Sequence, residues 1–146
     1  MIGEKAPDFT LKDQFGNDFH LYEKIGKPVL LLFYPKDDSL ICTKQLCDYD
    51  INLNRFIEKG INVAAISFDS VESHLKFSKK HKLNYPLLSD SEKNVGKLYF
   101  AISVFGSMKR KTVLIDEVGF VRMEDERLPL FYLKPEDLIN KLHIIN

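Results

Sequence analysis

The chain has 146 residues, of which 45% are hydrophobic and 29% charged, and this indicates one compact domain over residues 1–146. Its 21 basic and 21 acidic residues give a formal net charge of zero, which argues against binding to nucleic acid or to an anionic membrane surface. The sequence has no apolar run near the roughly 20 residues of a membrane-spanning helix, and its start, MIGEKAPDF, lacks the apolar core of a secretory signal. Two cysteines are too few for a secreted disulfide scaffold, so we expect a cytoplasmic protein with reactive cysteines.

The first half of the chain predicts a hairpin and then strands that alternate with a helix. Apolar and polar residues alternate around the turn from Gln14 to Asn17, as in a β-hairpin. The apolar runs PVLLLFY and INVAAISF are typical of strands buried on both faces, and the helix between them ends at Gly60. Its expected stripe consists of Leu46, Asp50, Leu53 and Ile57. The predicted elements are a hairpin of residues 8–11 and 17–21, strands of residues 28–34 and 61–68, and a helix of residues 43–59.

The second half of the chain completes an α/β pattern. A polar helix is expected to be capped by Asp69 or Ser70, and Gly119 supplies the positive φ that the connection of a second hairpin needs. The predicted elements are a helix of residues 70–81, a strand of residues 85–88, a brief helix from Asp90 or Ser91 toward Leu98, strands of residues 112–116 and 120–124, and a last helix from Pro135 to about Leu142. This order predicts a central mixed β-sheet with helices on both faces.

Cys42 lies at the junction between a buried strand and the following helix, where open α/β sheets present their ligand sites. Unpaired N–H groups and the positive end of the helix dipole favour the thiolate there, which is the form that attacks electrophiles. For a single cysteine in a cytoplasmic protein, the alternative is a small buried hydrophobic residue. The position of Cys42 favours the reactive interpretation.

The remaining cysteine and the histidines indicate no metal or cofactor site. Cys47 lies five residues after Cys42 and forms no CxxC pair, and no suitably spaced histidines accompany the two cysteines. His20 and His143 lie near the ends of elements, whereas His74 and His81 fall on a Lys-rich helix and are predicted to be solvated surface residues. Nothing in the sequence supports a Cys–His dyad.

The segment from Pro35 through Ser39 to Cys42 resembles the peroxiredoxin active-site pattern P-x-x-x-(T/S)-x-x-C. The run CTKQLC, which ends at Cys47, resembles the PrxQ branch, also called bacterioferritin comigratory protein. Further segments resemble that branch in the same order, up to about Glu124: GEKAPDFTL, GKPVLLLFYPKDD, FDSVESH, YPLLSD and RKTVLID. The resemblance implies a thioredoxin-like fold with an added N-terminal hairpin, in agreement with the predicted element order.

The resemblance also implies a role for five residues. Cys42 is the peroxidatic cysteine, Cys47 the resolving cysteine, Ser39 supplies a hydroxyl, Pro35 shields the site and Arg110 contributes a guanidinium. Hydrogen peroxide and organic hydroperoxides are the implied substrates, a thioredoxin-like thiol is the implied reductant, and a monomer or weak dimer is expected. Taken singly, Arg110 could be a surface charge, Ser39 a helix cap, Pro35 a turn residue and Cys47 a packing residue.

The chain departs from the family pattern beside the site. Leu40 and Ile41 replace the usual Pro-Gly and add bulk, Ser39 replaces threonine, and Gln45 replaces glutamate, which leaves Arg110 with one less charged partner. Two other functions stay open. A thiol-disulfide oxidoreductase would be expected to carry CxxC, which is absent from the sequence, and a redox sensor or holdase would be oxidised without efficient turnover.

Helix geometry adds an expectation about resolution. Five helical residues correspond to about 140° and a rise of about 7.5 Å, so the Cα atoms of Cys42 and Cys47 should lie roughly 8 to 9 Å apart. A disulfide needs Cα atoms within about 7 Å. The helix is therefore expected to unwind locally when the two cysteines form a bond.

Overall fold

A computed structural model describes residues 1–145 of the chain. Its strands are β1 (Thr10–Lys12), β2 (Asp18–His20), β3 (Val29–Phe33), β4 (Asn62–Ser67), β5 (Leu87–Ser89), β6 (Arg110–Ile115) and β7 (Val121–Arg127). Its helices are α1 (Leu40–Ile51), α2 (Leu53–Ile57), α3 (Val71–His81), α4 (Asn94–Leu98) and α5 (Pro135–Ile139), with 3-10 helices η1 (Leu21–Lys24) and η2 (Leu142–Ile145). No helix within residues 1–145 has the length and apolar character needed to cross a membrane.

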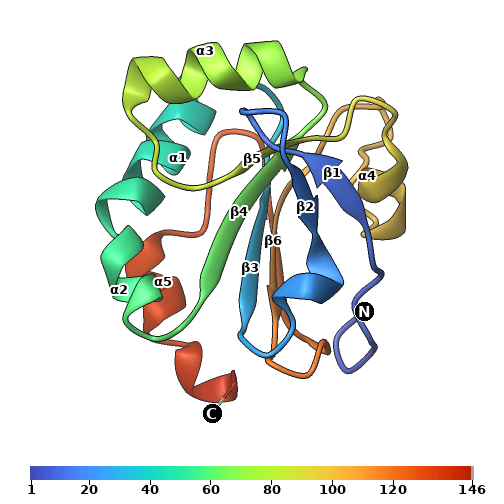
Figure 1. Ribbon diagram of the computed structural model, residues 1–146, viewed down its shortest axis with the longest axis vertical. Coiled ribbons are helices and arrows are strands. Elements are labelled where there is room, and N and C mark those ends of the chain that lie inside the picture. Colours follow the sequence, from blue (N-terminus) through green and yellow to red (C-terminus); the bar gives the residue numbers. More distant parts are fainter. Residues whose placement is uncertain (146) are drawn as a thin grey trace.

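The strands form one mixed sheet in the order β2-β1-β5-β4-β3-β6-β7, which runs through the centre of the molecule (Figure 1). β3, β4 and β5 are parallel, whereas β6 is antiparallel to β3 and β7 is antiparallel to β6. β1 pairs with β5 and with β2, both in antiparallel orientation, and so adds the N-terminal hairpin to the sheet. The predicted α/β class, the central mixed sheet and the N-terminal hairpin are confirmed.

Alternating side chains of the sheet divide the interior into two cores. Leu30 and Leu32 of β3 face the core that is covered by α1, α2, α3 and α5, whereas Val29, Leu31 and Phe33 face the core beneath the N-terminal segment and α4. In Figure 1, α1, α2 and α5 lie on one side of the strands and α4 lies on the other. All five β3 residues are buried, which explains the continuous apolar run in the sequence.

The prediction of a single helix over residues 43–59 is wrong in two respects. The helix begins earlier, at Leu40, and it breaks at Asn52 into α1 and α2. At this break the Asn52 side chain donates to the Asp48 carbonyl at 2.9 Å, which also accepts the Asn52 N–H at 3.2 Å. The expected stripe is also incorrect at Ile57, which is 56% exposed, because Phe56 fills the core instead.

Other boundaries shift by a few residues. β5 begins at Leu87 rather than at Tyr85, and the brief helix α4 begins at Asn94. The N-cap residue of α4 is Lys93, and the Asp90 carboxylate, three residues earlier, accepts the N–H groups of Val95 and Gly96 at 3.1 and 2.7 Å. The last helix, expected to reach Leu142, ends at Ile139, and η2 follows. Ser70 caps α3, as one of the two alternatives predicted.

Candidate active site

The loop of residues 34–39 connects the C-terminal end of β3 to the N-terminus of α1 and brings Cys42 into the first turn of that helix. Ser39 is the N-cap residue, and its carbonyl accepts the first helical hydrogen bond, from Thr43 N–H at 2.9 Å. The N–H groups of the first turn, including that of Cys42, have no acceptor within a helix and carry the positive end of its dipole. The Cys42 side chain itself is fully buried.

Arg110 contacts Cys42 from the other side of the site. It is the first residue of β6, whose start lies beside the end of β3 because Phe33 pairs with Lys111. One guanidinium nitrogen, Nη2, lies 3.3 Å from Cys42 Sγ and 2.9 Å from the Pro129 carbonyl, whereas Nη1 donates to Gln45 Oε1 at 2.7 Å. The structure therefore joins three segments that are distant in the sequence: the start of α1, the start of β6 and the chain after β7.

Arg110 is the buried cation of this site, with only 4% of its surface exposed. Within residues 1–145, no carboxylate forms an ion pair with it, and its Nε and the Nε2 of Gln45 are buried without a hydrogen-bond partner. A buried charge without a counter-ion is costly. A thiolate at Cys42 Sγ would supply that counter-ion, so the arrangement favours the reactive form of the cysteine.

The two lysines beside Arg110 point elsewhere. Lys111 follows the alternation of the strand onto the opposite face, where its Nζ donates to the Tyr99 carbonyl at 2.7 Å and pairs with Glu124 at 3.0 Å. Lys109 is partly exposed and lies 3.6 Å from Glu126. Of these three neighbouring cations, Arg110 alone contacts Cys42.

A cavity of about 480 Å³ opens beside the site. Pro35 and Arg110 contribute to its wall, and Arg110 is the residue whose guanidinium contacts Cys42 Sγ. Met108, Leu128 and Pro129 make much of the wall apolar, while Lys109, Glu126 and Arg127 lie among its polar residues. Such a wall suits a small ligand with an apolar part and one polar end.

Ser39 does not direct its hydroxyl at the cysteine in this structure. The hydroxyl donates to the Lys36 carbonyl at 3.2 Å. Ser39 is therefore the N-cap residue of α1, and its hydroxyl forms a hydrogen bond within the loop. Pro35 is half-buried at the wall of the cavity, next to Arg110.

Cys47 lies on the same helix as Cys42, and both cysteines are free. Cys47 is partly buried against the core beneath α1, and burial, with a smaller effect of the Asp50 carboxylate, raises the pKa of its thiol. Tyr85 holds this part of the helix, since its buried hydroxyl donates to the Leu46 carbonyl at 2.6 Å. The reduced form therefore keeps the two cysteines on one intact helix.

His74 contradicts the prediction of a solvated surface residue, because it is fully buried. It lies on the face of α3 that also buries Phe77 and Ser78. This i, i+3, i+4 spacing is visible in the sequence and could have revealed the buried face. The Lys-rich composition of the helix concealed it. His81 is partly exposed and lies 4.0 Å from the Asp38 carboxylate.

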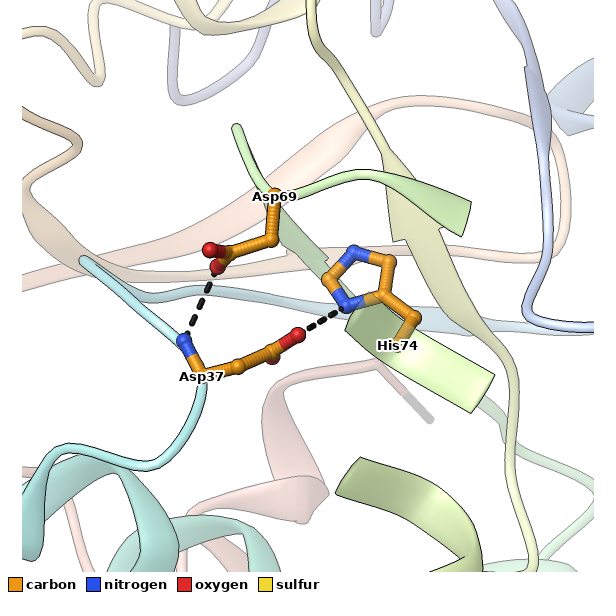
Figure 2. A group of neighbouring side chains, drawn as sticks. All are labelled: Asp37, Asp69 and His74. Atoms are coloured by element: carbon orange, nitrogen blue, oxygen red, sulfur yellow. Dashed lines mark hydrogen bonds and ion pairs between the residues drawn. The ribbon is translucent and has the colours of Figure 1, made fainter. Parts of the chain in front are cut away.

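The buried His74 belongs to a cluster with Asp37 and Asp69 (Figure 2). One potential ligand atom from each residue lies within 4.8 Å of the others, a spacing that a metal ion could use. Protein donors already occupy these acceptors: Asp37 accepts the hydroxyls of Tyr34 and Ser73 at 2.6 and 2.7 Å, and Asp69 accepts the Asp37 N–H at 2.9 Å. We therefore interpret the cluster as a hydrogen-bonded anchor of the loop.

Comparison with known proteins agrees with this geometry. The model of the AhpC/TSA family matches residues 2–124. The chain is 42% identical over 123 residues to the chloroplastic peroxiredoxin Q of Sedum lineare, covering 83% of this chain and 66% of that protein. It is 39% identical over 127 residues to a Coxiella burnetii protein assigned to the peroxiredoxins under the name bcp, covering 82% of this chain and 84% of that protein.

A solved structure supports the same assignment. The Xanthomonas campestris bacterioferritin comigratory protein, described for its alkyl peroxide reduction activity, superimposes with a TM-score of 0.80 at 25% identity, covering 92% of this chain and 87% of that chain. The thioredoxin-like fold expected from the sequence is confirmed. The chain spans 66% and 58% of the plant relatives from Sedum lineare and Suaeda salsa. By its family match and these relatives, the chain belongs to the AhpC/TSA family, in the peroxiredoxin Q and bacterioferritin comigratory protein branch.

Proposed function

We propose that the chain is a thiol peroxidase that reduces hydroperoxides at Cys42. One observation carries the proposal: Cys42 Sγ lies 3.3 Å from a buried Arg110 guanidinium that has no carboxylate partner among residues 1–145. This environment favours a thiolate, which is the nucleophilic form of cysteine. The branch to which the chain belongs supports the same activity.

In the first step the Cys42 thiolate attacks the terminal oxygen of the hydroperoxide. A sulfur–oxygen bond forms while the oxygen–oxygen bond breaks, which leaves a sulfenic acid on Cys42. The second oxygen departs with a proton, as an alcohol from an organic hydroperoxide or as water from hydrogen peroxide. Arg110 and the Cys42 N–H donate to the peroxide oxygens and stabilise the negative charge that develops on the leaving oxygen.

In the second step Cys47 resolves the sulfenic acid. Its thiolate attacks Cys42 Sγ, a disulfide bond forms, the sulfur–oxygen bond breaks, and the oxygen leaves as water after protonation. Because both cysteines lie on α1, five residues apart, this step needs local unwinding of the helix. A dithiol reductant of the thioredoxin type then supplies two electrons and two protons and becomes oxidised itself.

The wall of the cavity supports organic hydroperoxides as substrates beside hydrogen peroxide. Met108, Leu128 and Pro129 offer apolar contacts to an alkyl group, while Arg110 faces the peroxide end. We assign to Pro35 the role of shielding the site. Ser39 has an auxiliary role, because its hydroxyl must leave the Lys36 carbonyl before it can reach a peroxide. The cytoplasmic location and the monomer or weak dimer stay predictions.

A steady-state assay with thioredoxin, thioredoxin reductase and NADPH tests the proposal. Wild-type protein should consume hydrogen peroxide and an alkyl hydroperoxide catalytically, and Cys42→Ser should abolish turnover. A Cys42→Ser variant that kept a tenth of the wild-type rate would show that Cys42 is not the nucleophile. Oxidation of only one equivalent of wild-type protein, without turnover, would instead indicate a redox sensor or holdase.

A further inference from the structure

Asp37 anchors the loop that precedes the reactive cysteine, although it contacts neither Cys42 nor the cavity. It is an aspartate with only 5% of its surface exposed, five residues before Cys42. Its carboxylate accepts the Tyr34 hydroxyl at 2.6 Å and the Ser73 hydroxyl at 2.7 Å, and it lies 2.8 Å from His74 Nδ1. These three polar contacts hold the buried carboxylate, and with it this residue of the loop, in one position.

His74 connects this anchor to β5. Its Nε2 lies 3.1 Å from the Leu88 carbonyl, which can only accept, so Nε2 carries a hydrogen. Its Nδ1 faces the Asp37 carboxylate at 2.8 Å, and Figure 2 marks this contact by a dashed line. The two ring nitrogens therefore connect the loop residue Asp37 to the Leu88 carbonyl of β5. Burial raises the pKa of Asp37, but the hydrogen bond and charge of His74, with smaller contributions from Tyr34 and Ser73, outweigh burial and lower it.

The backbone of the loop is held as well. The Asp37 N–H donates to the Asp69 carboxylate at 2.9 Å, and the Ser67 hydroxyl donates to the same oxygen at 2.6 Å. Asp69 follows β4, Leu88 belongs to β5, and His74 belongs to α3. Figure 2 shows Asp37 between Asp69 and His74, with its backbone nitrogen toward the first and its carboxylate toward the second. The residue after β4 and helix α3 therefore hold Asp37 directly, and β5 holds it indirectly through His74.

The position of Asp37 determines where α1 begins. Only Asp38, which has a left-handed φ of 62°, separates it from the N-cap residue Ser39. Cys42 lies in the first turn after that cap, whereas Arg110 is carried by β6, which does not depend on the loop. A shift of the loop would therefore change the distance between Cys42 Sγ and the guanidinium, which is 3.3 Å in this structure.

We propose that His74 is a positioning residue for peroxide reduction, which holds Asp37 and thereby places Cys42 against Arg110. This inference rests on the proposed function of Cys42. His74 contacts no reacting atom, so it acts only through the loop. Misplacement of a reacting group by about 1 Å can cost a factor of about 100 in rate, so even a small loop shift should be measurable.

Two substitutions of His74 separate its two hydrogen bonds. In His74→Asn the amide nitrogen can occupy the place of Nδ1 and keep the bond to Asp37, whereas in His74→Gln it can occupy the place of Nε2 and keep the bond to Leu88. Both variants lose the imidazole ring. Asp90→Asn is the matched control, because Asp90 is also a buried carboxylate that accepts backbone N–H groups, at α4.

The experiment measures the second-order rate of Cys42 oxidation by hydrogen peroxide in a Cys47→Ser background, by rapid quench and mass spectrometry. Circular dichroism selects a temperature at which every variant is folded. His74→Gln should slow oxidation by about tenfold or more, while His74→Asn stays within about threefold of the parent protein and Asp90→Asn reacts at the parental rate. A purely structural role would lower the stability of both His74 variants without separating their rates.

Equal rates for His74→Gln and the parent protein would overturn the inference, and so would equal slowing of the two His74 variants. If His74→Gln fails to fold, Ser73→Ala removes one donor from the same Asp37 oxygen and should slow oxidation by about threefold. Parental reactivity of Ser73→Ala would then overturn the inference. A parent protein that does not react with peroxide at Cys42 would refute the proposed function instead.

Discussion

Substitution of Arg110 by alanine tests the electrostatic basis of the proposed site. The guanidinium is buried and lies 3.3 Å from Cys42 Sγ, with a neutral amide and a backbone carbonyl as its other partners. At that distance a full charge pair is worth about 5 kcal/mol with an effective dielectric constant of about 20. Desolvation of both ions opposes this attraction, and water that enters the space left by the side chain would replace part of it.

The expected net loss in Arg110→Ala is therefore smaller than the Coulomb value. Removal of one preorganised donor from an oxyanion site costs about 100-fold to 1,000-fold, and we expect the lower end, near 2.7 kcal/mol, because the Cys42 N–H remains. Arg110→Lys should react about tenfold more slowly than wild type, since an ammonium keeps the charge but loses the fork that contacts sulfur, amide and carbonyl together.

Stopped-flow or rapid-quench reaction with hydrogen peroxide at one fixed pH measures the second-order rate of Cys42 oxidation. Arg122→Ala removes an exposed arginine of β7 as the control. Equal oxidation rates of wild type and Arg110→Ala would refute the electrostatic reasoning.

Three further predictions concern α1 and the loop before it. Amide hydrogen exchange across residues 43–53 should be faster in the disulfide form than in the reduced protein, with Cys47→Ser as control. The proposed unwinding would be contradicted if protection stayed unchanged while mass spectrometry confirmed the Cys42–Cys47 bond. Tyr85→Phe removes a hydroxyl that donates to a carbonyl in the middle of α1. The substitution should lower the free energy of unfolding by about 1 kcal/mol and speed disulfide formation, which is measured by alkylation after acid quench. A slower disulfide step would be inconsistent with helix opening. Because folding lowers the pKa of Asp37, the ionised carboxylate contributes stability that is complete above its unfolded pKa of about 3.9 and is lost as pH falls through the lower folded value. The difference in unfolding free energy between wild type and Asp37→Asn should therefore shrink on acidification in a urea titration series, and a growing difference would contradict the assignment.

Local patterns predicted most of the framework. The apolar runs became β3 and β4, and Gly119 has the positive φ of 96° that its turn requires. The position of Cys42 at a junction between strand and helix also followed from sequence, although α1 begins at Leu40, before Cys42, rather than after it. These features depend on residues within a few positions of one another, which is why their spacing was sufficient.

Side-chain hydrogen bonds to nearby carbonyls mark two other features. At the break between α1 and α2 the Asn52 side chain bonds to the carbonyl four residues earlier, and no periodicity of apolar residues signals this. Ser39 likewise carries a hydroxyl that suits a peroxide site, but the loop directs it to the Lys36 carbonyl. In both cases the residue type indicated a side chain that forms hydrogen bonds, but the sequence did not predict which carbonyl accepts the bond.

The charge environment of the site was decided by tertiary structure alone. Arg110 and Cys42 are 68 residues apart, and they meet because β6 pairs with β3 in a register that places its first residue beside the start of α1. His74 was predicted to be solvated from the lysines around it, yet packing of α3 against the sheet buried it opposite Asp37, 37 residues away. The sequence by itself determined which segments are strands and helices and which cysteine lies at a junction between them, because those properties arise from neighbouring residues. Which charges are buried, and which groups neutralise them, depends on how the elements pack, because burial and pairing are properties of the assembled sheet and helices.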